Sequence, residues 1–141
     1  MEFDIVIIGG GLVGAGLAAS LKQSGLSLAL VESQSSPMRA KVPASVEDWD
    51  SRIYAISPGS RSFLEHSGAW ALLDAGRIAP VEAMRVFGDT GEELEFSAYQ
   101  MGVAELACIV ENRELQQALW QVLQHQENLT LIHPANCSDA Q

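Results

Sequence analysis

Three glycines and one carboxylate near the start of the chain have the types and the spacing to bind a phosphate-bearing ligand. Gly9, Gly11 and Gly14 form the pattern Gly-x-Gly-x-x-Gly, and Glu32 follows Gly14 by 18 residues. In dinucleotide-binding folds the first glycine permits a tight turn, the second lets the backbone approach a pyrophosphate, and the third lets a helix pack closely on a strand. The pattern therefore predicts a dinucleotide site with its phosphates at a helix N-terminus.

The carboxylate of Glu32 lies close to the offset at which an acidic side chain accepts hydrogen bonds from a ribose hydroxyl pair. A charge-assisted bond of this kind contributes about 1.5–3 kcal/mol. A negative charge here would also repel a 2′-phosphate, so we expect the site to reject NADP.

The residues around the glycines predict the strand–helix–strand unit that such a site needs. Ile5–Ile8 is an apolar run typical of a strand buried on both faces, and an Ala- and Leu-rich helix is expected to run to about Ser24. Gly25 would end that helix, and Leu28–Val31 would form the second strand. The alternative interpretation is a glycine-rich turn in an ordinary α/β core.

Composition and charge narrow the class of protein. The chain has 141 residues, of which 48% are hydrophobic, and a formal net charge of −10, so we expect one globular domain that does not bind nucleic acid. The uncharged run 5–21 is almost long enough to cross a bilayer. However, Glu2 and Asp4 precede it and glycines interrupt it, so we expect no transmembrane segment and a cytoplasmic location. Cys108 and Cys137 form no CxxC pair, which predicts packed, reduced thiols and no metal site.

A helix and a strand near the end of the chain are expected to rejoin the first unit. Asn112 is a candidate N-cap for an amphipathic helix over Arg113–His125, and Leu129–Ile132 is a further strand. A helix followed by a strand indicates a return to a parallel sheet. Earlier in the chain, Ser57 before Pro58 predicts the start of another helix, which Gly68 would end. A second short helix is expected from Ala69 to Asp74, and Gly76 and Pro80 would close this helical section.

The middle of the chain departs from this alternation. Ala83–Phe87 and Leu94–Phe96 flank a loop with two glycines and predict a hairpin, followed by an extended run over Leu106–Val110. Residues 34–50 predict a long surface loop whose Arg39 and Lys41 either touch a phosphate or are solvated. An antiparallel element between the parts of a nucleotide-binding sheet favours a flavoprotein over a nicotinamide dehydrogenase.

Three segments resemble the FAD-dependent aromatic hydroxylases, specifically the branch that acts in ubiquinone biosynthesis. Residues 9–32 read GGGLVGAGLAASLKQSGLSLALVE, residues 50–70 read DSRIYAISPGSRSFLEHSGAW, and residues 109–123 read IVENRELQQALWQVL. The first segment is shared by many flavoproteins. The second is similar to the Asp-x-Arg-x-x-Ala-Ile-Ser stretch of that branch, which ends in Gly-x-Trp, and it is the more specific motif.

The resemblance implies an α/β fold, namely a Rossmann-like FAD-binding domain with a parallel sheet and a βαβ unit, interrupted by a small antiparallel β element. The chain would supply the N-terminal part of this domain, and roughly residues 81–110 would begin the β-sheet of an inserted substrate domain. The domain would be incomplete, because such enzymes run to several hundred residues. We therefore expect the chain alone to supply the ADP-binding half of the FAD site and to be inactive.

The resemblance also implies bound FAD, NAD(P)H as a transient reductant, and hydroxylation of an aromatic ring. A polyprenylated substrate would require a peripheral membrane contact or a lipid-handling complex. The implied cofactor-binding residues are Gly9, Gly11, Leu12, Val13, Gly14, Glu32, Arg52 and Arg113. The glycines and the backbone of Leu12 and Val13 would hold the pyrophosphate, Glu32 the ribose, and the two arginines the phosphates or the flavin edge.

Simpler roles and other functions remain open at this stage. Arg52 is alternatively a surface ion pair and Arg113 a charge at a helix start. No residue is expected to be catalytic, since His66, His125 and His133 have no partner at a useful spacing. Other functions that share the first motif are an FAD enzyme such as a prenyl reductase or a halogenase, and a non-catalytic nucleotide-binding subunit.

Overall fold

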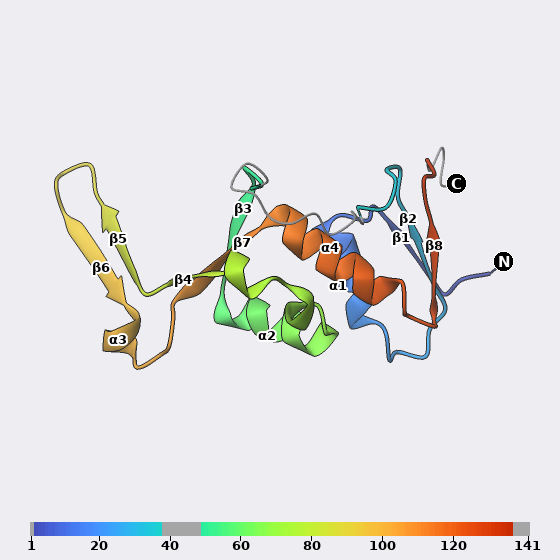
Figure 1. Cartoon of the computed structure of the whole chain (residues 1–141), viewed down its shortest axis with the longest axis horizontal. Helices are drawn as coiled ribbons and strands as arrows, with labels where there is room; N and C mark the ends of the chain where they lie inside the picture. Colours follow the sequence, from blue (N-terminus) through green and yellow to red (C-terminus); the bar gives the residue numbers. More distant parts are fainter. Residues whose placement is uncertain (1, 38–48, 137–141) are drawn as a thin grey trace.

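The computed structural model describes residues 2–37 and 49–136 and has a mixed α/β architecture with a parallel sheet, as expected (Figure 1). Arg39, Lys41 and Cys137 lie outside the described residues. The elements in chain order are β1 (Ile5–Ile8), α1 (Leu12–Ser20), β2 (Leu28–Val31), β3 (Ile53–Ile56), α2 (Pro58–Ser67), the 3₁₀ turns η2 (Trp70–Leu72) and η3 (Ala75–Arg77), β4 (Ala79–Val81), β5 (Ala83–Phe87), β6 (Glu93–Ser97), α3 (Ala98–Met101), β7 (Ala107–Glu111), α4 (Asn112–Leu123) and β8 (Leu129–Ile132).

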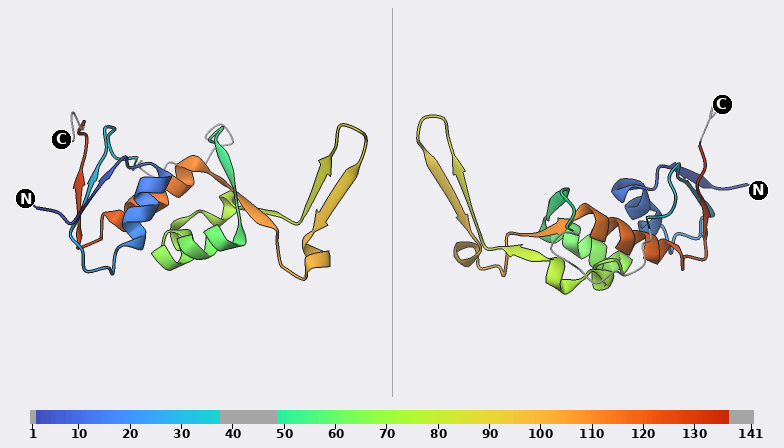
Figure 2. Two further views of the ribbon diagram at one scale, coloured as in Figure 1. Left: turned by 180° about the vertical axis from the view of Figure 1, so that it is seen from behind. Right: turned by 45° about the horizontal axis from the view of Figure 1, so that its top comes forward.

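The parallel sheet has the strand order β1-β2-β8. Ile5 pairs with Leu28, and Leu28 pairs with Leu129, so the last strand adds to the first unit across more than 100 residues of chain. The predicted return of a helix and a strand to the parallel sheet is thus confirmed. Helices α1 and α4 lie side by side next to this sheet in both views (Figures 1 and 2). Trp120 of α4 is fully buried in the core that they form.

The expectation that β1 is buried on both faces is wrong. Ile7 is 7% exposed, whereas Val6 and Ile8 are 54% and 62% exposed. Alternate residues of a strand point to opposite faces of the sheet. The helices cover the Ile7 face, and the described residues leave Val6 and Ile8 on the other face more than half exposed to solvent.

Two antiparallel sheets lie farther along the molecule. Strands β3, β7 and β4 form one in the order β3-β7-β4, and β5 and β6 form a hairpin that projects away from the rest (Figures 1 and 2). The predicted hairpin is confirmed, and its pairs Met84↔Phe96 and Val86↔Leu94 place these four side chains on one face. Sequence patterning missed β3 and β4. Pro80, which was expected to close a helical section, lies in the edge strand β4, where its missing N–H is tolerated.

Helix α2 begins and ends as expected. The side chain of Ser57 accepts a hydrogen bond from the N–H of Ser60, and Pro58 occupies the first turn. Gly68, with φ of +83°, ends the helix in the left-handed region that favours glycine. In place of the single short helix expected after it, the chain makes the 3₁₀ turns η2 and η3.

Two helix boundaries differ from the expectation. Helix α1 ends at Ser20 rather than near Ser24, because residues 21–24 form turns that lead to Gly25 at φ of +76°. The N-cap of α4 is Glu111 rather than Asn112, which is the first helical residue. Glu111 pairs with Ile53 as the last residue of β7, so helix α4 starts directly from a strand.

No helix within residues 2–37 and 49–136 combines the length and the apolar character needed to cross a bilayer.

We predict that Gly14→Ala lowers the free energy of unfolding by at least about 2 kcal/mol, because a Cβ at this position would lie 1.9 Å from the Gly9 carbonyl oxygen. Gly59→Ala in α2 is the control, since a Cβ there meets nothing within 4 Å and helix propensity favours alanine. Urea unfolding of both variants measures the effect. Equal stabilities would contradict the close packing of α1 on the turn.

Candidate functional site

The glycine turn joins β1 directly to α1. Gly9 has φ of +101°, and its N–H donates to the Val31 carbonyl oxygen at 2.8 Å. Gly14 packs against the Gly9 carbonyl so closely that a side chain is excluded. A Cβ on Gly11 would instead point into open space, and no side chain caps α1 at Gly11. The N-terminal amides of the helix therefore lack a side-chain acceptor, as at an anion-binding helix start.

Gly10 contributes to the turn in a way that motif reasoning missed. Its N–H donates to Oε2 of Glu32 at 2.6 Å, and its carbonyl accepts from Nε1 of Trp120 at 2.7 Å. A Cβ on Gly10 would lie 2.6 Å from Cζ2 of Trp120. The run of three consecutive glycines was the available signal for Gly10. No local signal marked Trp120, which is 110 residues away in the sequence.

Glu32 directly follows β2, and its carboxylate accepts hydrogen bonds from the turn and from the next two residues. Its Oε1 accepts from the N–H of Gln34 at 2.7 Å and from the hydroxyl of Ser33 at 3.1 Å, and its Oε2 accepts from Gly10. The hydrogen bond from the Gln34 N–H, followed by that from Gly10, holds the pKa of Glu32 below its ordinary value. The carboxylate is therefore ionised at neutral pH and is fixed against the turn.

The structure brings the backbones of Arg52 and Arg113 together at the junction of β3, β7 and α4. The N–H of Asn112 donates to the Arg52 carbonyl at 2.9 Å. Asp50 bridges the two arginines, since its Oδ1 accepts from the Arg52 N–H at 3.0 Å and its Oδ2 from the Arg113 N–H at 3.1 Å. The bond from the Arg52 N–H is the main cause that lowers the pKa of Asp50. Asp50 was part of the quoted motif, but its bridging role depends on tertiary contacts.

A buried ion pair anchors Asp50 in turn. Glu111 is 1% exposed, and its Oε1 accepts from Nη2 of Arg77 at 2.7 Å and from the Asp50 N–H at 3.1 Å. The guanidinium of Arg77 lies over the Trp49 ring at 5.0 Å, and its pKa is raised chiefly by the bond to Glu111. Removing one partner of a buried pair leaves an uncompensated charge, so this contact fixes the junction strongly.

An apolar cavity of about 420 Å³ lies between α1, α2 and α4. Leu12 and Val13, expected at the pyrophosphate, line it together with Phe63 of α2 and Leu115 of α4. Val13 is 87% exposed, so the first turn of α1 is accessible to a ligand. The first turn of α1 thus lines an opening between three helices.

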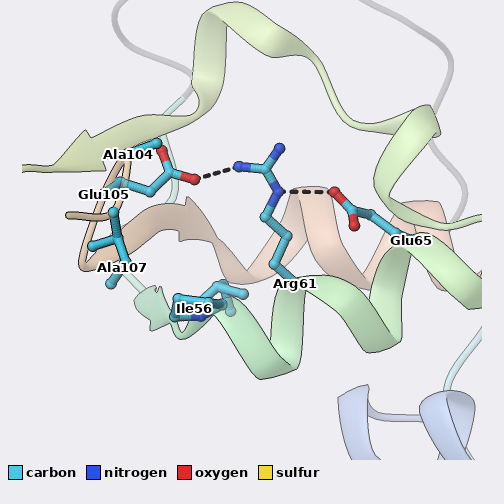
Figure 3. A pocket seen from close by; sticks show the side chains of 8 residues that line it. Ile56, Arg61, Glu65, Ala104, Glu105 and Ala107 are labelled. Atoms are coloured by element: carbon cyan, nitrogen blue, oxygen red, sulfur yellow. Dashed lines mark hydrogen bonds and ion pairs between the residues drawn. The ribbon is translucent and has the colours of Figure 1, made fainter. Parts of the chain in front are cut away.

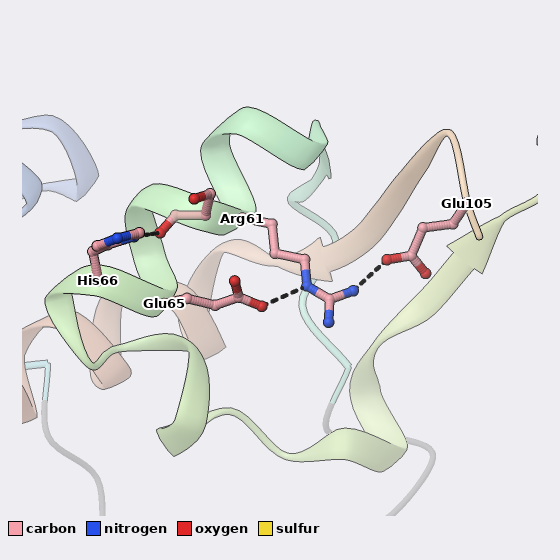
Figure 4. Close-up of polar contacts among 5 residues, drawn as sticks. Arg61, Glu65, His66 and Glu105 are labelled. Carbon is pink, nitrogen blue, oxygen red and sulfur yellow. Dashed lines mark hydrogen bonds and ion pairs between the residues drawn. The ribbon is translucent and has the colours of Figure 1, made fainter. Parts of the chain in front are cut away.

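A second cavity, of about 350 Å³, lies between α2 and the segment before β7 (Figure 3). Arg61 reaches across it and pairs with Glu65 at 2.9 Å and with Glu105 (Figures 3 and 4). The Arg61 guanidinium also lies over the Trp70 ring at 4.9 Å. Its charge is compensated by two carboxylates, so this cavity presents no free cation to an anionic ligand. Next to Glu105 in this region, Cys108 is a buried free thiol whose pKa is raised by burial.

The three histidines make local contacts. Nδ1 of His66 lies 2.7 Å from the Ser62 carbonyl (Figure 4), and Nδ1 of His125 lies 2.9 Å from the Gln121 carbonyl. The His133 ring meets Trp120 edge-on at 5.1 Å. Within the described ranges, no three His, Cys, Asp or Glu side chains gather closely enough to hold a metal ion.

Known proteins with similar sequences are ubiquinone-biosynthesis hydroxylases. The chain is 34% identical to the 3-demethoxyubiquinol 3-hydroxylase of Escherichia coli over 134 residues, which is 94% of the chain and 33% of the relative. It is 34% identical to the mitochondrial ubiquinone biosynthesis monooxygenase COQ6 of Danio rerio over 126 residues, 86% of the chain and 25% of the relative. The resemblance that the motifs indicated is confirmed. No protein-family model matches the chain.

Solved structures share the fold. The crystal structure of PqsL, a probable FAD-dependent monooxygenase from Pseudomonas aeruginosa, matches 92% of this chain and 32% of its own with a TM-score of 0.64 and 20% identity. The chain thus spans a quarter to a third of the length of the proteins it matches.

We predict that the Glu32 carboxylate stabilises the chain in a pH-dependent way. Because its pKa is lower in the folded state, the stabilisation is present above the unfolded-state value of about 4.5 and is lost as the pH falls through the folded-state value. Glu32→Gln should therefore lower stability at pH 7, with the difference from the wild type shrinking at pH 3–4. Thermal unfolding across this range measures it, with Glu127→Gln, an exposed position, as control. A pH-independent difference would contradict the role of the carboxylate.

Proposed function

We propose that this chain is the ADP-binding half of a Rossmann-like FAD domain in an NAD(P)H-using monooxygenase that hydroxylates an aromatic ring in ubiquinone biosynthesis. The observation that carries the proposal is the 34% identity to the Escherichia coli hydroxylase over 94% of the chain. The similarity to COQ6 supports the same reaction class. These relatives favour the hydroxylase over the prenyl reductase, the halogenase and the non-catalytic subunit considered above.

The residues of the turn fit the ADP part of FAD. Gly11 leaves its Cβ position open, Gly9 permits the turn at φ of +101°, and α1 begins without a side-chain cap. The macrodipole of α1 favours a pyrophosphate at this position, held by the backbone of Gly11, Leu12, Val13 and Gly14. Bound FAD would supply the redox chemistry, while the chain's own residues bind it, orient it and exclude water.

Glu32 and the two arginines would complete the contacts. Oε2 of Glu32 accepts one hydrogen bond within the turn, from Gly10, and keeps a further lone pair for a ribose hydroxyl. Arg52 and Arg113, placed side by side through Asp50, would bring positive charge toward the phosphates or the flavin edge. The proposed assignment thus includes a residue that binds through its carboxylate and two that bind through guanidinium groups.

We further propose that residues 81–110 begin the sheet of an inserted substrate domain. The hairpin face that carries Met84, Val86, Leu94 and Phe96 is apolar and 41–56% exposed. On the other face Arg85 lies 3.2 Å from Glu95. An isolated two-stranded hairpin is marginally stable in water, so the apolar face favours further strands packed on it. The substrate would be an aromatic ring with a polyprenyl chain, reached from a peripheral membrane complex.

We predict that Gly11→Ala in the full-length gene product weakens FAD binding by at least about tenfold while the apoprotein keeps its stability. In the apoprotein the new Cβ would meet no other atom within 4 Å. In the FAD complex it would occupy the space that the pyrophosphate needs. Flavin fluorescence titration of the apoprotein measures the affinity. Gly88→Ala in the loop between β5 and β6, where a Cβ would lie 3.6 Å from the Glu92 carbonyl oxygen, is the control far from the turn. Equal FAD affinity in wild type and Gly11→Ala would contradict the site.

The 141-residue chain alone is expected to bind FAD weakly and to hydroxylate no substrate, because it spans about a third of its relatives. Assays with NADH and NADPH and an aromatic ubiquinone precursor test this. Stoichiometric flavin together with product formation by the isolated chain would overturn the expectation.

A further inference from the structure

The Gly10 residue is held on both sides by groups from different parts of the fold. Glu32 accepts its N–H, and the indole of Trp120 donates to its carbonyl at 2.7 Å in a buried hydrogen bond. Trp120 is 0% exposed and belongs to α4, which packs beside α1. A neutral indole N–H is a donor only, so the carbonyl of Gly10 is its matched partner.

This contact determines the direction of the next amide. A trans peptide unit is planar, so its carbonyl and its N–H point in opposite directions. The only cis bond in the described residues precedes Pro134, so the unit between Gly10 and Gly11 is trans. Because the indole holds the Gly10 carbonyl toward the core, the N–H of Gly11 points away from Trp120. The position beside Gly11 is the open one, where a Cβ would meet nothing within 4 Å.

The indole is fully buried and packs closely against the turn and His133. A Cβ on Gly10 would lie 2.6 Å from its Cζ2 atom, and the ring of His133 packs edge-on against it at 5.1 Å. His133 directly follows β8, so the end of the sheet packs against the indole on the side of its ring edge, while α4 carries the indole to the turn. The Gly10 carbonyl would lose its buried donor if the indole were absent, which makes rotation of the Gly10–Gly11 peptide unit easier.

We propose that Trp120 is a positioning residue for the phosphate-binding turn: through the Gly10 carbonyl it presets the Gly11 N–H toward the cofactor's pyrophosphate. This inference rests on the proposed FAD site. Trp120 would touch no cofactor atom and would act only through the peptide unit that it orients. Packing volume alone would not require its N–H.

The first test is Trp120→Phe in the full-length gene product, which removes the N–H donor but keeps an aromatic ring in the core. FAD and ADP affinities of the folded apoprotein should both fall at least about fivefold, since both ligands carry the pyrophosphate. Amide hydrogen exchange at Gly11, followed by NMR of glycine-labelled protein, should become faster. Trp70→Phe, a half-buried tryptophan elsewhere, should change neither quantity.

The second test uses the close contact at Gly10. Gly10→Ala should destabilise the protein because its Cβ would lie 2.6 Å from Cζ2 of the indole, the closest of its contacts, and 3.2 Å from the side chain of Glu32. Gly10→Ala combined with Trp120→Phe should be more stable than the sum of the single effects predicts, because the smaller ring makes room. Additive losses of stability would overturn the contact on which the inference depends.

The outcomes separate the inference from the proposed function. If the wild type binds neither FAD nor ADP, the proposed function is wrong. The double-mutant cycle of Gly10 and Trp120 still tests the contact in that case. A wild type that binds FAD, with Trp120→Phe equal in affinity and in Gly11 exchange, overturns the positioning role. A stability loss in Trp120→Phe without any change in affinity also overturns it, because that result describes a core residue alone.

Discussion

The closeness of α1 to the end of β1 is the constraint on which the rest of the structure depends. The Gly9 carbonyl and the Cα of Gly14 approach so tightly that a methyl group cannot be placed between them. This packing starts α1 directly at the end of β1, so that Leu12 and Val13 of its first turn line the cavity between α1, α2 and α4. Without it, the helix dipole and the turn amides would not face one position, which the proposed pyrophosphate site requires.

Helix α4 connects this turn to the other half of the candidate site. Its first turn receives the carboxylate of Asp50, which also holds the start of β3, and a later turn carries Trp120 beneath Gly10. The buried pair of Glu111 and Arg77 fixes the end of β7 from which α4 starts. The distance between the glycine turn and the two arginines is therefore set by the length of one rigid helix rather than by a loop.

Two apolar surfaces are exposed on the described residues. Val6 and Ile8 expose one face of the parallel sheet, and the hairpin exposes the side chains that its register gathers on one side. The opposite face of the parallel sheet packs against helices. On the opposite face of the hairpin, Arg85 forms ion pairs with Glu93 and Glu95. Their exposure agrees with relatives about three times as long as the chain.

The elements with local signals could be predicted from the sequence: the strand Ile5–Ile8, the start of α2 at Pro58 and the hairpin β5–β6. Their turn residues and their periodicity depend on residues that are close together in the sequence. The spacing of the glycines is a local signal of the same kind, and it located the candidate turn. The exposure of Val6, the role of Gly10, the support from Trp120 and the bridge made by Asp50 could not be predicted. Each of these depends on groups brought together from distant positions, and side-chain contacts at separations of 60 to 110 residues leave no periodic trace in one sequence. The sequence alone thus determined which residues form the turn, whereas the packing of α4 and β8 against it decided how its amides are aimed.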